Sequence, residues 1–514
     1  MKSLRALTCG LLAGALLETV TVAPLFAAPP VQTDNLALLK DLKIENGKIV
    51  DLVHETSESV TTPYGKAHNN LKPRTILKIV LNPAKGSNIN VEIWLPDADA
   101  WNKRLVGLGN SGAAGHIQSM NLAGSHGQGY AVVTTDMGTG PNASVGDGNP
   151  EVWKDFGFRA THLMTVVAKQ VSKAYYGQEP ELSYFMGAST GGQQALQEAQ
   201  RYPEDYDGIV AGVPAHCRTP LHAYFLWNYR ILHKCPFTTS QETNVIAAAN
   251  EYMASREAPM VAGKFITDPR CNGGDIEAVI KLALQKDPTL TPEHADALRK
   301  LFDGPRQAIT GERIFCGMPL GSQPFSGGEG NLYLFNWVFG ANKDLMQIDF
   351  GKDMDTYTAA LAPYLNAENP DLTPFYARGG KMLMVSGSAD ITVPYTATLD
   401  YYERVIEHFG SLDKVKSFFR FYIIPGMTHG GGGAFIGSLP NSFGLLINWR
   451  EKNIAPDMVM TKRIYPNKTE IDMPLYPYPT KAVWDAASNS FKPVEGPRGG
   501  VERVADHFRP PAAE

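Results

Sequence analysis

The sequence predicts an α/β fold, in which a mostly parallel sheet carries helices on both faces and a large insertion interrupts the chain. Between residues 104 and 213, apolar runs alternate with glycine-rich turns and helical patterns, and this alternation is typical of a parallel sheet. The alternation is lost after Pro214 and returns at Lys381. The length of 514 residues also exceeds what a single core usually holds, which favours a large insertion or a second domain.

The amino-terminal segment is typical of a secretory signal. Two basic residues precede an apolar run over 6–17, Glu18 ends that run, and small residues follow at Ala27 and Ala28. The run is too short to span a bilayer comfortably, and a retained amino-terminal anchor is the alternative interpretation. We expect residues 1–28 to be a cleaved signal peptide, and the mature protein to be secreted or periplasmic and free of the membrane.

Charge excludes one class of partner. The formal net charge is -5 and the isoelectric point is near 6.2, so the chain has no basic surface of the kind that nucleic-acid binding requires. We expect no nucleic-acid partner, and the sequence leaves the oligomeric state open.

Four cysteines remain once the signal is set aside, and in an exported protein they are expected to pair. Four thiols allow three connectivities, and the sequence does not decide between them. Because short loops close most easily, we favour Cys217 with Cys235 and Cys271 with Cys316.

The predicted elements follow one another along the chain. Residues 75–96 hold two apolar alternations around Pro83 and Gly86, which indicates an antiparallel strand pair. Strands are then predicted over 104–108, 130–134, 182–186 and 208–213, and helices over 158–176 and 193–202. The insertion has helical patterns over 242–253, 275–284 and 292–301, and the core resumes with a strand over 381–385, a helix over 395–409 and a strand over 418–424. We therefore assign 29–214 and 379–514 to a catalytic core domain and 215–378 to a lid domain over its site.

A serine between glycines is the candidate nucleophile. Residues 187–191 read GASTG, directly after an apolar strand and before a helical pattern. In a nucleophile elbow of the form G-x-S-x-G, the serine takes a strained backbone conformation, and the glycines let strand and helix approach closely. The turn also directs the free N–H groups of the helix at the reacting carbonyl oxygen. We therefore predict Ser189 as the nucleophile, with a simple turn as the alternative.

A nucleophilic serine requires a base and an acid that orients the base. In the chain order of an α/β-hydrolase, an Asp or Glu and then a His follow the serine, each in a loop after a strand. Asp390 and His429 meet both conditions, although singly Asp390 fits a helix cap and His429 an ordinary loop histidine. We predict the triad Ser189, Asp390 and His429. Asp136 precedes the serine, so we expect it to be a structural carboxylate that accepts loop N–H groups.

An oxyanion hole needs two backbone donors. Thr190, the residue after the nucleophile, supplies one N–H group, and we expect the loop 109–112 to supply the other through Asn110 or Gly109. The alternative is that this loop is a plain glycine-rich turn.

These residues lie in stretches that resemble the tannase and feruloyl esterase family of α/β-hydrolases, which also includes hydrolases of terephthalate monoesters. The stretches are WNKRLVGLGNSG, DFGFRATH, YFMGASTGGQQALQEAQRYPEDYDGIVAGVPA, GGKMLMVSGSADITVPYTATLDYYERV and FYIIPGMTHGGGG, which span residues 101–433. The resemblance implies Ser189, Asp390 and His429 as the triad, and a lid over 215–378 that shapes the acyl pocket.

The chain departs from the family pattern in two places. Many members have a disulfide between a Cys before the nucleophile and a Cys after the catalytic His, but Ala188 and Gly430 occupy those positions here, so packing alone must hold the triad. Many members also bind calcium through aspartates before a D-P-R-x-C motif, whereas the stretch before Asp268 has Glu257 as its only acid. A hard cation requires several oxygen ligands, so we predict no calcium there.

The expected substrate is a small ester of an aromatic acid, such as a plant-derived ester. Residues 331–339 read NLYLFNWVF, an aromatic lid stretch without Arg or Lys. Rings suit a flat acyl group, whereas a free carboxylate on that group would favour an arginine fork. We predict that Phe335, Trp337 and Phe339 contact a feruloyl, hydroxybenzoyl or galloyl group, and the alternative is that these rings are buried lid core.

Together these assignments predict a secreted serine carboxylesterase that works through an acyl-enzyme without a metal or other cofactor. His216 and His222 have the right type for metal ligands, but no carboxylate or third histidine follows at a matching helical interval. Three alternatives stay open: a hydrolase of terephthalate monoesters, an acyltransferase with the same triad, and a catalytically inactive phenolic or carbohydrate binding protein. A peptidase on the same fold is more distant.

Overall fold

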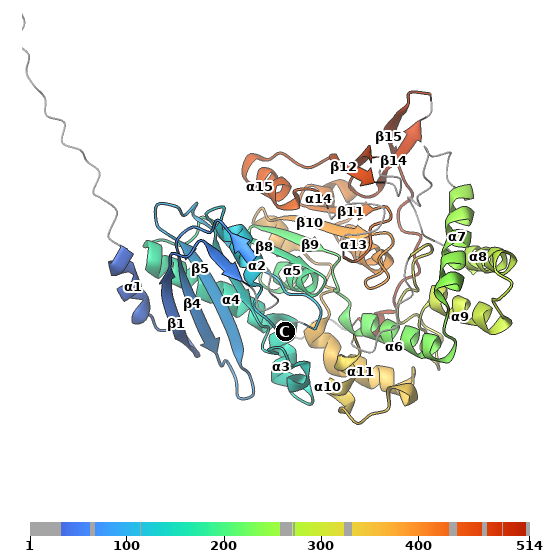
Figure 1. The fold of residues 1–514 in the computed structure, drawn as a ribbon, viewed down its shortest axis with the longest axis horizontal. Helices are drawn as coiled ribbons and strands as arrows, with labels where there is room; N and C mark the ends of the chain where they lie inside the picture. Colours follow the sequence, from blue (N-terminus) through green and yellow to red (C-terminus); the bar gives the residue numbers. More distant parts are fainter. Residues whose placement is uncertain are drawn as a thin grey trace, which may run out of the picture.

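A nine-stranded sheet forms the centre of the computed structural model (Figure 1). In spatial order its strands are β1 (Gly47–Glu55), β4 (Arg74–Leu81), β5 (Ile89–Pro96), β7 (Ala131–Thr135), β6 (Arg104–Leu108), β8 (Leu182–Ala188), β9 (Gly208–Gly212), β10 (Lys381–Gly387) and β11 (Phe419–Ile424). The pairs β1–β4, β4–β5 and β5–β7 are antiparallel, and the strands from β7 to β11 are all parallel. The predicted α/β fold with a mostly parallel sheet is therefore confirmed.

The structure describes residues 32–61, 67–113, 115–256, 270, 273–322, 331–430, 439–464, 470–485 and 487–509. The predicted signal peptide, Glu257, Asp268 and Cys271 lie outside these ranges. Within them, no helix is long and apolar enough to cross a bilayer.

Both faces of the parallel strands are covered by helices. Successive side chains of a strand point to opposite faces, and in β10 Met382 and Met384 belong to one apolar core whereas Leu383 and Val385 belong to another. Helices α4 (Ala160–Tyr176), α5 (Thr190–Arg201) and α13 (Tyr395–Phe409) cover the first face, and α2 (Ser119–His126) and α15 (Ser442–Lys452) cover the second. This double coverage explains why these strands are apolar without alternation.

A helical insertion separates β9 from β10, although the two strands are neighbours in the sheet. It contains α6 (Arg218–Lys234), α7 (Thr239–Arg256), α8 (Gly273–Lys286), α9 (Pro292–Asp303), α10 (Tyr333–Phe339), α11 (Lys352–Leu365) and α12 (Thr373–Ala377). Most of these helices share a third apolar core, which residues 137–156, 393–397 and 504–508 complete, whereas Phe375 of α12 packs in the core of the first sheet face. In Figure 1, α7, α8 and α9 lie together at the end of the molecule opposite β1. We propose that this insertion is the lid domain expected over 215–378.

The remaining elements are short. They are α1 (Gln32–Lys40), the hairpin β2 (Ser59–Thr61) and β3 (Ala67–Asn69), α3 (Pro150–Lys154), α14 (Leu412–Lys416), and two carboxyl-terminal hairpins, β12 (Val459–Ile464) with β13 (Glu470–Leu475) and β14 (Thr480–Asp485) with β15 (Ser490–Glu495). Figure 1 shows the carboxyl-terminal hairpins beside the β11 edge of the sheet.

Candidate active site

Ser189 occupies the sharp turn between β8 and α5, with φ 60° and ψ -117°. Its N–H donates to the Gly212 carbonyl at 2.9 Å, and its carbonyl accepts from the N–H groups of Gln193 and Ala215 at 3.1 Å each. A non-glycine residue with positive φ is strained and persists only where its surroundings fix it. These three hydrogen bonds fix the backbone of Ser189 from the strand, the helix and the loop after β9.

Two flanking glycines are required by close packing. A β-carbon at Gly187 would lie 2.2 Å from the Gly191 carbonyl oxygen, and one at Gly192 would lie 2.6 Å from that of Gly212. Both distances are shorter than real contacts, so these positions exclude any larger residue unless the backbone shifts. The glycines therefore let α5 start directly against the sheet, as expected of a nucleophile elbow.

The structure brings together the three side chains predicted as a triad. The Ser189 hydroxyl oxygen lies 2.9 Å from Nε2 of His429, and Nδ1 of His429 lies 2.8 Å from Oδ2 of Asp390. Asp390 is fully buried, and its other oxygen, Oδ1, accepts from the N–H groups of Thr392 and Val393 at 2.9 and 2.8 Å. This geometry can activate a hydroxyl, because the carboxylate orients the imidazole and the imidazole can accept the serine proton.

Asp136 has the structural role that the sequence predicts. Its Oδ1 accepts from the N–H groups of Asn90 and Gly138, and its Oδ2 accepts from the Asn90 side chain. Burial raises the pKa of this carboxyl above its ordinary value.

The loop 109–112 differs from its predicted role. The N–H of Gly109 donates to the Met186 carbonyl at 2.8 Å, which continues the β6–β8 pairing, and the N–H of Asn110 donates to Oε1 of Gln194 at 2.8 Å. Neither group is free to bind an oxyanion, and this corrects the choice of Asn110 or Gly109. The N–H of the next residue, Ser111, has no acceptor among the residues that the structure describes.

Ser189 opens into a cavity of about 340 Å³. The elbow, Ser111 and Gly112 form one wall, and His429 and Val393 form another. Helix α6 supplies Arg218, Leu221, His222 and Phe225, whose spacing of three or four residues puts them on one helix face. Burial, and then the nearby Arg218 cation, hold the pKa of His222 far below its ordinary value, so this ring is neutral at neutral pH.

The predicted substrate contacts of α10 are corrected. Phe335 and Trp337 are buried, Phe335 stacking on Tyr357 with ring centroids 4.4 Å apart, and Trp337 donating from Nε1 to the Ala143 carbonyl at 2.7 Å. Phe339 is also absent from the described cavity lining. Of this helix only Tyr333, its first residue, lines the cavity.

The cavity also contains a positively charged side chain, although residues 331–339 have no Arg or Lys. Arg218 lines it from α6, outside residues 331–339, so the composition of that stretch does not describe the whole site. Arg218 and Phe225 were missed in the sequence, although the helical spacing of apolar residues after Cys217 is visible there, and Ser111 was named only as part of the loop 109–112.

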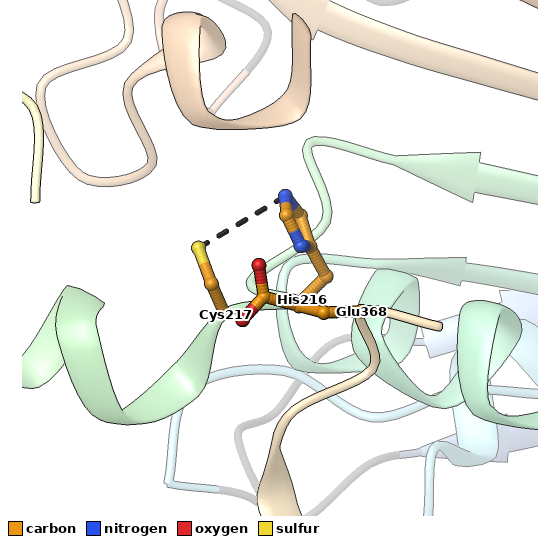
Figure 2. A group of neighbouring side chains, drawn as sticks. All are labelled: His216, Cys217 and Glu368. Carbon is orange, nitrogen blue, oxygen red and sulfur yellow. Dashed lines mark hydrogen bonds between the residues drawn. The ribbon is translucent and has the colours of Figure 1, made fainter. Parts of the chain in front are cut away.

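One buried group has the side chains of a metal site. Ligand atoms of His216, Cys217 and Glu368 lie within 4.8 Å of one another, and Figure 2 shows the three side chains next to each other. However, the Glu368 carboxylate lies 3.7 Å from Arg404 and 3.5 Å from Arg509, and two guanidinium groups disfavour a further cation. Burial lowers the pKa of His216 to about 3 and raises that of Cys217 well above its usual value, so the thiol is protonated. We interpret the group as a structural ionic cluster.

The predicted disulfide between Cys217 and Cys235 is wrong. Both are free thiols, and they cap opposite ends of the 17-residue helix α6. A helix of that length separates its ends by about 25 Å, whereas a disulfide requires Cα atoms about 6 Å apart. Cys316 is also a free thiol, and its predicted partner Cys271 lies outside the described residues.

The parallel sheet, the strained serine between strand and helix, and the order Ser, Asp, His define an α/β-hydrolase. A sequence profile described as "Tannase and feruloyl esterase" matches residues 75–342 and 325–494. An uncharacterized esterase of Xanthomonas campestris is 30% identical, with 82% of this chain and 84% of that protein covered. A probable feruloyl esterase B-1 of Aspergillus oryzae is 29% identical, with 79% and 80% covered. The chain belongs to the tannase and feruloyl esterase family and is a carboxylic ester hydrolase.

Solved structures share the fold. Feruloyl esterase B from Aspergillus oryzae aligns with a TM-score of 0.75 at 22% identity, with 90% of this chain and 100% of that chain covered. Tannin acyl hydrolase from Aspergillus niger aligns with a TM-score of 0.72 at 18% identity, with 93% and 96% covered.

Proposed function

We propose that this hydrolase is a serine esterase of small aromatic esters, with Ser189 as nucleophile, His429 as base and Asp390 as the acid that orients the base. One observation carries the proposal: His429 bridges the Ser189 hydroxyl at 2.9 Å and the Asp390 carboxylate at 2.8 Å. With the proton of the imidazole held on Nδ1 by Asp390, Nε2 is left to accept the serine proton.

The reaction follows from these positions. Ser189 attacks the ester carbonyl while His429 takes its proton, and the carbonyl oxygen becomes an oxyanion. The N–H groups of Thr190 and Ser111 stabilise that oxyanion, since both line the cavity and neither has an acceptor in the described part of the chain. His429 then gives the proton to the leaving alcohol, and water releases the acid from the acyl-enzyme by the same steps in reverse.

The cavity supports an acyl group with one aromatic ring. Its volume of about 340 Å³ lies at the small end of ligand sites, and aromatic side chains with few polar groups suit such a ligand. Phe225 and Tyr333 supply the rings, and Leu221 and Val393 supply aliphatic walls. Feruloyl, hydroxybenzoyl and galloyl esters fit this description, and the signal over residues 1–28 favours an exported enzyme that meets them outside the cytoplasm.

The test is Ser189→Ala, assayed by chromatography on methyl ferulate, methyl gallate and methyl 4-hydroxybenzoate. We expect the variant to lose at least about 10³-fold in kcat while its circular dichroism is unchanged. A matched control is Ser417→Ala, because Ser417 is exposed beyond the end of α14. Retention of more than a trace of activity by Ser189→Ala would refute the assigned nucleophile. An active wild type that never turns over aromatic esters would instead refute the substrate class.

A further inference from the structure

Arg218, the first residue of α6, joins three parts of the site. Its side chain is 4% exposed. Nη1 donates to the Thr190 hydroxyl at 2.9 Å, and Nη2 donates to the Gly112 carbonyl at 3.1 Å and to the Tyr333 hydroxyl at 2.7 Å. The Thr190 hydroxyl in turn donates to the same Gly112 carbonyl at 2.5 Å. One guanidinium group thus connects the helix after the nucleophile, the loop 109–112 and α10.

These contacts flank the proposed oxyanion donors. Ser111 lies between two residues that hydrogen bonds hold in place. On one side, the Asn110 N–H donates to Gln194 and the Asn110 carbonyl accepts from Gly191; on the other, the Gly112 carbonyl accepts from Arg218 and Thr190. Gly112 has φ +60° and no atom within 4 Å of where its β-carbon would lie, so packing does not hold it. The Ser111 N–H shares a peptide plane with the Asn110 carbonyl, which accepts from the Gly191 N–H, and the hydrogen bonds of the Gly112 carbonyl hold the loop on the other side of Ser111.

The positive charge of Arg218 is buried without a negatively charged partner in the described part of the chain. Among the described residues, its hydrogen-bond partners are neutral groups of Thr190, Gly112 and Tyr333, none of them a carboxylate. The ring of Phe156 lies 5.3 Å from its guanidinium carbon. The first turn of a helix is unfavourable for a cation, and burial of a charge is costly. A positive charge in this position stabilises negative charge that develops at the adjacent oxyanion hole.

We propose that Arg218 is a positioning residue for the oxyanion hole: it holds Thr190 and Gly112 so that the N–H groups of Thr190 and Ser111 converge. The inference rests on the proposed function. Recognition of a carboxylate on the substrate is the competing role, since Arg218 lines the cavity. Three of its five N–H groups donate to Thr190, Gly112 and Tyr333. Nε has no partner in the described part of the chain, so the experiment is designed to separate the two roles.

The experiment compares Arg218→Met, Arg218→Lys and Thr190→Val on methyl 4-hydroxybenzoate and on the methyl monoester of terephthalate. We expect Arg218→Met to lower kcat about 10²-fold on both esters, with KM changed by less than about three-fold. Thr190→Val removes the bridging hydroxyl, and we expect a smaller loss of kcat. The double variant should be no slower than Arg218→Met alone, because the two residues act through one contact.

Arg230→Met is the matched control. Arg230 lies on the same helix, donates to the Ile348 carbonyl, and has its guanidinium carbon 5.6 Å from the ring of Phe350, but it does not line the cavity. It should keep the wild-type kcat.

Three results would overturn the proposal. The first is an unchanged kcat in a folded Arg218→Met variant. The second is a raised KM for the terephthalate monoester alone, with kcat unchanged, which would assign Arg218 to substrate recognition. The third applies if Arg218→Met does not fold, and it is a wild-type kcat in both Arg218→Lys and Thr190→Val. Activity of Ser189→Ala would refute the proposed function separately, so the two failures are distinguishable.

Discussion

Asp390 divides its two carboxylate oxygens between two roles. Oδ1 accepts the N–H groups of Thr392 and Val393, and Oδ2 faces Nδ1 of His429. Because the backbone pair fixes the carboxylate, the direction of Oδ2 does not depend on the histidine. In the proposed mechanism, this arrangement favours the imidazole tautomer that leaves Nε2 free for Ser189.

We predict that Asp390→Asn lowers kcat about 10⁴-fold with the fold intact. The amide has one oxygen, and if that oxygen keeps the two backbone N–H groups, the NH₂ group opposes the Nδ1 proton of His429 and favours the wrong tautomer. Steady-state kinetics on methyl ferulate measure the loss. Asp136→Asn is the control, since it also changes a buried loop carboxylate that binds backbone N–H groups, and it should affect stability but not kcat. A decrease of less than about ten-fold in Asp390→Asn would contradict the assigned role.

Some residues of the candidate site could be predicted from the sequence, and others could not. The juxtaposition of Ser189, Asp390 and His429, the proposed triad, was predictable because chain order and strand context restrict each of them. The proposed oxyanion donor Ser111 was not, because the N–H of Asn110 is bound by Gln194, a side chain on another element. Arg218 was missed for the same reason: its partners Thr190 and Gly112 are distant in sequence.

Helix α6 presents different faces to two environments. Leu221 and Phe225 face the cavity beside Ser189, whereas Trp227 donates to the Lys300 carbonyl and packs on Phe350 inside the insertion. The helical period of this segment is visible in the sequence, but which face meets the site depends on how the chain leaves β9. The same limit applies to α10, where the position of Trp337 depends on the Ala143 carbonyl.

The two faces of α6 give a prediction. Phe225→Ala should raise KM for methyl ferulate about ten-fold, because it removes a ring from the wall that contacts the acyl group. Trp227→Ala is the matched control: both side chains are half-buried aromatic residues of the same helix, and only Phe225 lines the cavity. Initial rates over a range of ester concentrations measure KM. Equal KM values in the two variants would place the acyl group elsewhere.

Across the whole molecule, the sheet edge and the insertion assemble the site. The elbow after β8 and the loops after β6, β10 and β11 meet at the carboxyl ends of parallel strands, where ligands bind in open α/β sheets. The strand and helix alternation made this part of the fold predictable. The carboxyl-terminal hairpins β12–β13 and β14–β15 were not predicted. Strand β15 is almost wholly exposed, and the buried positions of β12 and β13 include Thr461 and Pro474, so the apolar alternation that indicates a strand is weak there.

Stability of the whole fold should depend on pH through His126. Its ring is buried beside Trp94, with ring centroids 6.1 Å apart, and neither nitrogen has a partner in the described part of the chain. Burial, and then the Arg74 cation, lower the pKa of His126 from 6.5 to about 4. The unfolded chain therefore binds this proton first, so stability is lost as pH falls below about 6.5 and the loss is complete near pH 4. The difference between the two pKa values corresponds to about 3 kcal/mol.

The measurement is urea unfolding of the wild type and of His126→Phe at pH 7 and pH 4.5. Many groups titrate in this interval, including the buried carboxyl of Asp136, whose raised pKa has the opposite effect on stability. These groups are common to both proteins, so the difference between the two pH dependences isolates His126. We expect the wild type to lose about 2 to 3 kcal/mol more than the variant between the two pH values. Parallel pH dependences would mean that His126 takes up its proton without unfolding, which would require a partner or solvent access for its ring.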